Sequence, residues 1–273
     1  MRRWWRQGLA AVAAGVFLLP LYWAVVASLR QPGLPPTNGI AWWPTQPHWD
    51  NYLEIFRLLP LGRYLGNSLL VVAIAVPVTV GMASGAGFAM SQLAETARER
   101  LMRLSVALLL IPGAAVWLFR FQILRGLGLL DTVWALVLPA FAGSNPLFIL
   151  LFYWTCRRIP PELFEAARLE GANAWTLWRR LALPLSRPTL VGVVVLTFVA
   201  YWSDFISPVL YIFDPRDYTV AVGLQILKQM DPTNWSLLMA AAVFMSVPVI
   251  ILFLVLQRFF LHDLSLAHLF DEN

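Results

Sequence analysis

Six long apolar stretches dominate this chain of 273 residues. They lie at roughly 9–29, 65–90, 104–124, 133–155, 189–211 and 237–260. A helix needs about 20 predominantly apolar residues to cross the hydrocarbon core of a bilayer. Each stretch contains Gly or Pro, which membrane helices tolerate because neighbouring groups satisfy the freed backbone. The sequence therefore predicts an all-α, polytopic membrane protein in which residues 1–273 form one domain with six transmembrane helices.

The composition agrees with lipid as the solvent and excludes several classes of function. Hydrophobic residues make up 59% of the chain and charged residues only 13%, whereas soluble domains carry about a quarter charged residues. The lone Cys156 excludes an internal disulfide, and the three histidines lack the spacing of a zinc hydrolase. No phosphate-binding G-x-x-x-x-G-K-[ST] loop occurs. We therefore expect no catalytic residue, metal site or bound cofactor.

The basic residues indicate how the helices are oriented. With a cytoplasmic N-terminus, thirteen basic residues fall in the inside segments: Arg2, Arg3, Arg6, Arg98, Arg100, Arg103, Arg157, Arg158, Arg168, Arg179, Arg180, Arg187 and Arg258. Six fall outside: Arg30, Arg57, Arg63, Arg125, Arg216 and Lys228. Inside loops of membrane proteins carry the excess of Lys and Arg. Both termini are therefore predicted to be cytoplasmic, with the first run retained as a span. Basic residues scattered in this way argue against nucleic-acid binding.

Two predicted connections are longer than a turn requires. The first, outside the membrane at about 30–64, ends in a predicted helix that places Trp49, Tyr52, Leu53 and Phe56 on one face. This face suits aromatic anchoring at the membrane interface, a docking surface for an extracytoplasmic partner, or both. The second connection, residues 156–188, is cytoplasmic.

The 156–188 connection carries signals for two helices joined at a glycine. Pro160 and Pro161 favour a helix start, and Gly171 favours a left-handed residue that ends this helix. Asn173 is a candidate cap for a second helix over 174–182, which we expect Pro184 to end.

This connection resembles the EAA motif of ABC-importer permeases. The match comprises Glu165-Ala166-Ala167, Gly171 after three residues, and a closing Leu183-Pro184. The resemblance implies a cytoplasmic coupling helix between the fourth and fifth membrane helices, docking on a nucleotide-binding subunit. It assigns the ATPase contact to Glu165, Ala166, Ala167, Arg168, Leu169 and Gly171.

Further segments are similar to carbohydrate permeases of the shorter, MalG type found in the maltose transporter. They are Asn51-Tyr52, Gly66-Asn67-Ser68, 126–131, Trp202-Ser203-Asp204-Phe205, Tyr218-Thr219-Val220 and Gln257-Arg258-Phe259-Phe260. The resemblance implies import of a sugar or related polyol by alternating access, in a bacterial or archaeal plasma membrane. It also implies a second permease, two ATPase subunits that hold ATP and Mg²⁺, and an extracytoplasmic solute-binding protein.

Polar residues inside the predicted spans are candidates for the solute pathway, because ionisable groups are costly in lipid. Asp204 in the fifth run lies near Tyr201 and Trp202, and a carboxylate beside aromatic rings suits recognition of a polyol. A structural contact between helices is the alternative. Arg120 lies near the outer end of the third run, where its side chain can extend to the headgroups.

Small residues in the second run indicate close helix packing, or alternatively a flexible gating point. These residues are Gly81, Ser84, Gly85 and Gly87.

Three alternative functions can be compared with the sequence. A permease for a non-sugar solute such as glycerol-phosphate would share the same motifs. A stand-alone six-span channel or carrier would need polar residues on several spans, yet only Arg120 and Asp204 qualify. A membrane-embedded enzyme would need a cluster of acids, histidines or nucleophiles inside the membrane, which the spans lack.

Overall fold

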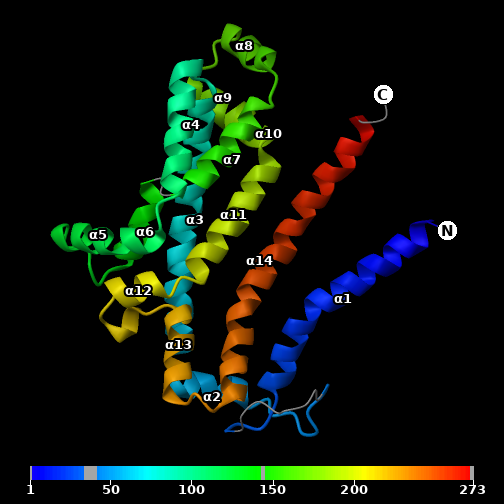
Figure 1. The fold of residues 1–273 in the computed structure, drawn as a ribbon, viewed down its shortest axis with the longest axis vertical. Coiled ribbons are helices and arrows are strands. Elements are labelled where there is room, and N and C mark those ends of the chain that lie inside the picture. The colour runs from blue at the N-terminus through cyan, green and yellow to red at the C-terminus, as the bar shows by residue number, and fades with distance from the viewer. Residues whose placement is uncertain (1, 34–41, 143–144, 271–273) are drawn as a thin grey trace. The chain divides into compact units, whose positions relative to one another are not determined.

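The computed structural model describes residues 2–33, 42–142 and 145–270 (Figure 1), and within those ranges every regular element is a helix. The helices in chain order are α1 (Arg2–Ser28), α2 (Asn51–Leu58), α3 (Leu61–Ser91), α4 (Glu95–Leu109), α5 (Gly113–Gly126), α6 (Val133–Phe141), α7 (Pro146–Arg157), α8 (Pro161–Leu169), α9 (Ala174–Leu177), η1 (Trp178–Ala182), α10 (Leu183–Leu185), α11 (Arg187–Trp202), α12 (Ile206–Tyr211), η2 (Pro215–Asp217), α13 (Val220–Met230) and α14 (Trp235–Phe270). The predicted all-α class is confirmed.

Two compact units account for the packing. The first unit comprises Met1–Gly66 with Thr219–Ile250, and the second comprises Asn67–Tyr218 with Ile251–Asn273. In the first unit, the Asn51 side chain donates from Nδ2 to the carbonyls of Ser28 (2.7 Å) and Arg30 (2.8 Å). Because these carbonyls lie at and just after the end of α1, Asn51 satisfies backbone groups that the helix leaves unpaired.

A closely packed core joins α3, α7 and α11 in the second unit. Its buried members include Ala83 of α3, Phe152 of α7 and Val193 of α11. At Gly87 a Cβ would come within 2.6 Å of the Phe152 Cβ and 2.7 Å of the Ile149 carbonyl oxygen. The packing predicted for the small residues is therefore confirmed at Gly87. Gly81 and Gly85 have open space around them.

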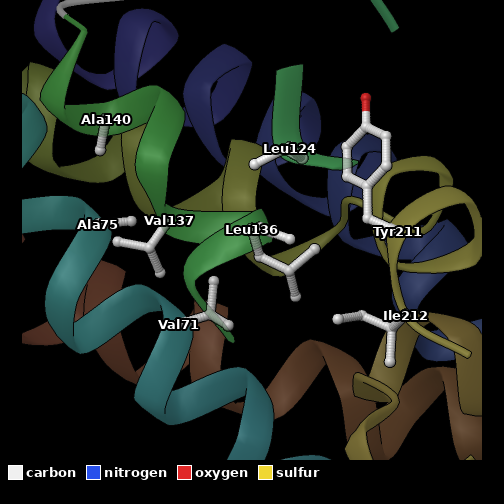
Figure 2. Packing of buried hydrophobic residues seen from close by; sticks show 9 residues of the cluster. Val71, Ala75, Leu124, Leu136, Val137, Ala140, Tyr211 and Ile212 are labelled. Carbon is white, nitrogen blue, oxygen red and sulfur yellow. The ribbon is translucent and has the colours of Figure 1, made fainter. Parts of the chain in front are cut away.

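A second apolar cluster in the same unit joins α3, α5, α6 and the end of α12 (Figure 2). It contains Val71, Ala75, Leu124, Ala135, Leu136, Val137, Ala140, Tyr211 and Ile212. The Tyr211 hydroxyl donates to the Trp117 carbonyl at 3.1 Å. This bond ties the end of α12 to α5.

Four of the predicted spans appear as helices long and apolar enough to cross a membrane. They are Gln7–Ser28, Leu61–Ser91, Val133–Arg157 and Trp235–Gln257, the third of which runs over residues 143–144. Two further helix pairs qualify only if each bent pair counts as one span. The described chain therefore has four candidate spans by this criterion, or six with the bent pairs included.

The predicted third run, 104–124, is not one straight helix. It divides into α4 and α5, which meet at an angle of 96°. Pro112 precedes α5 with an extended backbone (ψ 130°). Since Pro has no N–H and disfavours a helical residue before it, the apolar run bends at this point.

The predicted fifth run, 189–211, also differs from the structure. Helix α11 ends at Trp202, and α12 begins only at Ile206. With 16 residues, α11 is about 24 Å long, shorter than the hydrocarbon core of about 30 Å. The break lies at the polar pair Ser203-Asp204. Two polar residues lower the apolar content of the whole run only a little, so apolar content alone predicted one continuous span.

Helix α2 forms where the sequence predicts an interfacial helix. Its buried residues are Asn51 and Ile55. Leu53 and Phe56 of the predicted aromatic face are exposed, as is Trp49 just before the helix. Tyr52 is half-buried, and its hydroxyl shares a hydrogen bond of 2.7 Å with the Ser28 hydroxyl. The Phe56 ring packs edge-on against Phe244. Trp49 and Leu53 therefore remain available for lipid or a partner. Residues 34–41 of the predicted outside connection lie outside the described residues.

Candidate functional site

Helix α8 carries the motif residues of the long connection. It begins at Pro161 with Pro160 as its N-terminal flanking residue, and Glu162 lies in its first turn. The predicted helix start is confirmed, because proline has no N–H to leave unpaired at this position. Figure 1 shows α8 at one end of the second unit, beside α9.

The end of α8 forms a Schellman motif around Gly171. Gly171 has φ 86°, a left-handed conformation that favours glycine. The Ala172 N–H donates to the Ala167 carbonyl and the Gly171 N–H to the Arg168 carbonyl, both at 2.9 Å. These two bonds satisfy carbonyls that the helix end would otherwise leave unpaired. The positive φ expected at Gly171 is confirmed.

The second helix begins as the sequence predicts but continues further. The Asn173 side chain accepts from the Thr176 N–H at 2.9 Å, which confirms the predicted cap. Helix α9 then passes into a π-helical turn, Trp178–Ala182, and into α10, which ends at Leu185. The prediction that Pro184 ends this helix is therefore wrong. Pro184 cannot donate to the carbonyl four residues earlier, and the widened turn accommodates that missing bond.

An apolar cluster fixes α8 to the membrane helices. Phe164 is 3% exposed and packs against Phe88 of α3, with ring centroids 6.0 Å apart. Arg168 donates to the Gln92 side chain just after α3. The buried members of the cluster are Phe88, Cys156, Phe164, Leu177 and Ala182. One face of α8 is thus anchored to the unit that carries the membrane helices.

The opposite face of α8 is exposed. Leu169 is 90% exposed, and Glu165 and Ala166 are also exposed. Trp175 of α9, which packs on Trp178, is exposed as well. The predicted contact residues therefore lie on two faces. Glu165, Ala166, Leu169 and Gly171 are open to a partner, while Ala167 is half-buried against the cluster.

A small polar cavity lies within the second unit. Its volume is about 150 Å³, and it is lined by Arg120, Leu136, Pro139, Ala200, Tyr201, Asp204 and Ser207. Asp204 and Tyr201, two of the predicted pathway residues, therefore share one cavity with Arg120. Spacing along the chain could not show this, because 60 residues, 127–186, lie between α5 and α11.

Asp204 has a structural role at the break between α11 and α12. Its Oδ1 atom accepts from the backbone N–H groups of Ile206 and Ser207, each at 3.1 Å. These donors belong to the first turn of α12 and would otherwise lack partners. The carboxylate thus both caps a helix and faces a cavity, so the structural and pathway interpretations apply together.

Trp202, the third predicted pathway residue, is placed differently. It is 2% exposed and stacks on Phe198, with ring centroids 5.4 Å apart and an interplanar angle of 12°. It is not among the residues that line the cavity. In this structure the indole therefore packs inside the protein.

Three polar side chains in the motif segments hold backbone groups of distant segments. Besides Asn51, the Asn67 side chain donates to the carbonyls of Arg216 and Tyr218, each at 3.0 Å. Asp131 accepts from the N–H groups of Phe213 (2.8 Å) and Asp214 (2.9 Å). Sequence reasoning singled out these segments without a physical role for them. Their shared chemistry, a short Asn or Asp side chain that bonds to backbone groups, was the available signal.

Comparison with known proteins places the chain among transport proteins. The family described as "Binding-protein-dependent transport system inner membrane component" matches residues 67–265. The arabinooligosaccharides transport system permease protein of Halalkalibacterium halodurans is 28% identical over 94% of this chain and 92% of its own length. The trehalose/maltose transport system permease protein of Thermococcus litoralis is 28% identical over 96% and 95%.

A solved structure supports the fold. It is that of a bacterial ABC transporter involved in the import of the acidic polysaccharide alginate, with a TM-score of 0.74 at 20% sequence identity. The match covers 92% of this chain and 95% of the other. Because the family match spans most of the chain and includes α8, the family expected from the sequence is confirmed. The chain belongs to the inner-membrane components of binding-protein-dependent transport systems, and it is a multi-pass, non-catalytic transport subunit.

Proposed function

We propose that this chain is the permease subunit of an ATP-driven importer for a sugar or related polyol. Family membership supplies the transport class, and the names of relatives that match almost end to end supply the carbohydrate class. The main structural support for this mechanism is helix α8. One of its faces is anchored to the membrane helices, and the other is exposed. Such a helix can transmit force between a soluble partner and the membrane helices.

The exposed face of α8 suits a partner that closes over it. Ala166 is small enough to permit close approach, and the nearly fully exposed Leu169 supplies an apolar contact. Glu165 suits a basic residue of the partner. The Phe164 ring then links any movement of α8 to α3 through Phe88. A soluble ATPase subunit that holds ATP and Mg²⁺ is the partner that this arrangement requires.

The rest of the assembly follows from the same mechanism. Closure of two ATPase subunits would pull two such coupling helices together, which calls for a second permease beside this one. The excess of Arg in the segments around α4 and α8 supports a cytoplasmic position for α8 and both termini. The extracytoplasmic binding protein would then release solute into a pathway bordered by Tyr201 and Asp204.

ATP hydrolysis by the reconstituted complex tests the coupling role. The complex contains this chain, its partner permease, the ATPase and the binding protein. We expect Glu165→Ala and Gly171→Asp to abolish the stimulation of hydrolysis by binding protein and solute. The first removes a charge at the contact, and the second puts a β-carbon on a residue at φ 86°. Glu162→Ala is the matched control, because Glu162 is an exposed glutamate in the same helix outside the motif.

The outcome distinguishes a loss of coupling from a loss of assembly. Variants that assemble but do not stimulate hydrolysis support the proposal, with assembly measured by co-purification of the ATPase. If both motif variants respond to solute as fully as the parent, α8 is not the transmitting element and the proposed mechanism fails.

A further inference from the structure

We propose that a polar pocket beside α8 binds the headgroup of an aminophospholipid, a lipid that carries a phosphate and a primary amine. The pocket lies within the second unit and has a volume of about 290 Å³. Its lining comes from the end of α3, the last turn of α7 and helix α8. The site is separate from the solute pathway and does not depend on which solute is carried.

Three charged side chains line this pocket. Arg157 lies in the last turn of α7, and Glu165 and Arg168 lie on α8. Among the residues that the structure describes, no ion pair includes any of these three. A simple anion would meet the Glu165 carboxylate as well as the guanidiniums, and a simple cation would meet both guanidiniums.

A ligand with both charges matches this lining. The guanidiniums of Arg157 and Arg168 suit a phosphate, which Arg binds through two parallel hydrogen bonds. The Glu165 carboxylate accepts hydrogen bonds, so it suits a primary ammonium group, which has three N–H donors. Because a carboxylate has two oxygens, an amine at one of them leaves the other for the ATPase contact proposed above.

Hydrogen bonds hold Arg168 in place at the pocket. Its guanidinium donates to the Gln92 side-chain oxygen, and the Gln92 amide donates to the Ser91 hydroxyl at 3.2 Å. Ser91 is buried, and its hydroxyl donates to the Phe88 carbonyl at 2.6 Å. These bonds orient the guanidinium and leave its other N–H groups for a ligand. Binding therefore requires little further ordering of this side chain.

The pocket lies at the depth where a membrane lipid has its headgroup. Two candidate spans, Leu61–Ser91 and Val133–Arg157, end at the pocket. Trp154 is exposed on the same face of α7 as Arg157, and Trp gathers at membrane–water interfaces. Leu93 lines the pocket and is exposed, so it offers an apolar surface to the start of an acyl chain. Basic pockets between membrane helices bind lipid headgroups in this way.

Native mass spectrometry of the full chain, stripped of lipid in detergent, tests the inference. The probes are phosphatidylethanolamine, phosphatidylglycerol, which has no amine, and phosphatidylcholine, whose amine has no N–H. We expect one phosphatidylethanolamine to bind about tenfold more tightly than either other lipid, because only its amine can donate to a carboxylate.

Arg157→Gln should weaken that binding by about tenfold or more, since a charge-assisted pair of hydrogen bonds to the phosphate is lost. Arg158→Gln is the matched control. Arg158 is the adjacent exposed arginine and does not line the pocket, so this variant should bind the lipid like the parent.

Three results would overturn the inference. Equal affinity for phosphatidylethanolamine and phosphatidylglycerol would show that the amine is not recognised. Equal losses in Arg157→Gln and Arg158→Gln would show general attraction to basic residues and no site at this pocket. Glycerophosphoethanolamine, the same headgroup without acyl chains, is the soluble competitor, and we expect it to leave the lipid bound. Displacement at concentrations similar to that of the lipid would indicate a site for a soluble phosphate ester instead.

Discussion

The two ends of helix α11 are built in contrasting ways. Before its N-terminus, the connection from α7 carries a dense set of local signals, including Pro161, Gly171 and Asn173, and each performs the predicted conformational role. After its C-terminus, the apolar run continues to Tyr211 without Gly or Pro at the break, yet the helix stops at Trp202. The structure before the N-terminus of α11 follows from the backbone preferences of nearby residues, whereas the end of the helix at Trp202 follows from tertiary contacts.

This contrast shows what hydropathy measures in a membrane protein. Apolar content reports whether a segment can lie in lipid, but it is insensitive to the direction of the chain. At Ser203–Phe205 the helix is interrupted. Asp204 satisfies the first turn of α12, and the Tyr211 hydroxyl ties the end of α12 to α5. A helix in lipid can break where side chains replace the lost backbone bonds.

The largest effect should come from packing inside the membrane helices, at Gly87. Gly87→Ala places a methyl group within 2.8 Å of the Tyr153 backbone nitrogen and closer still to the Ile149 carbonyl oxygen. We expect a loss of about 3 kcal/mol in the free energy of unfolding, at the upper end of overpacking effects. Gly81→Ala, in the same helix with open space around it, should be neutral or slightly stabilising.

Thermal unfolding of both variants in detergent measures this difference. Equal stability of Gly87→Ala and Gly81→Ala would show that α3 and α7 are not packed as closely as described, and that local propensity governs this part of the chain as well.

A smaller effect is expected at the C-terminal end of α11. Asp204→Ala removes the acceptor of two backbone N–H groups, so we expect a loss of about 1–2 kcal/mol in the free energy of unfolding. Asp204→Asn retains an acceptor oxygen and should lose much less. Thermal unfolding in detergent compares the stability of these two variants. If alanine and asparagine are equally tolerated, the break at Ser203–Phe205 does not depend on this cap.

The smallest effect concerns the locally determined end. Asn173→Ala removes the cap on the Thr176 N–H, which costs about 1 kcal/mol at a typical N-terminus. Asn173→Ser keeps a capping oxygen and should remain close to the parent. Hydrogen exchange at α9 should rise in the alanine variant and remain unchanged in α12. Faster exchange in α12 would contradict the independence of the two ends.

The sequence by itself determined the all-α class, four of the apolar segments and the local geometry from Pro161 to Asn173, but not the continuation of the second helix past Pro184. These features depend on residues close in the chain, where proline, glycine and asparagine act through their own backbone preferences. It also determined the family, through the EAA motif on α8.

Only the tertiary structure decided the early end of α11 and the burial of Trp202. It also decided that Arg120 faces Tyr201 and Asp204 across one cavity. Each of these depends on which helix faces which, and apolar residues in lipid carry little information about facing because every side of such a helix is equally hydrophobic.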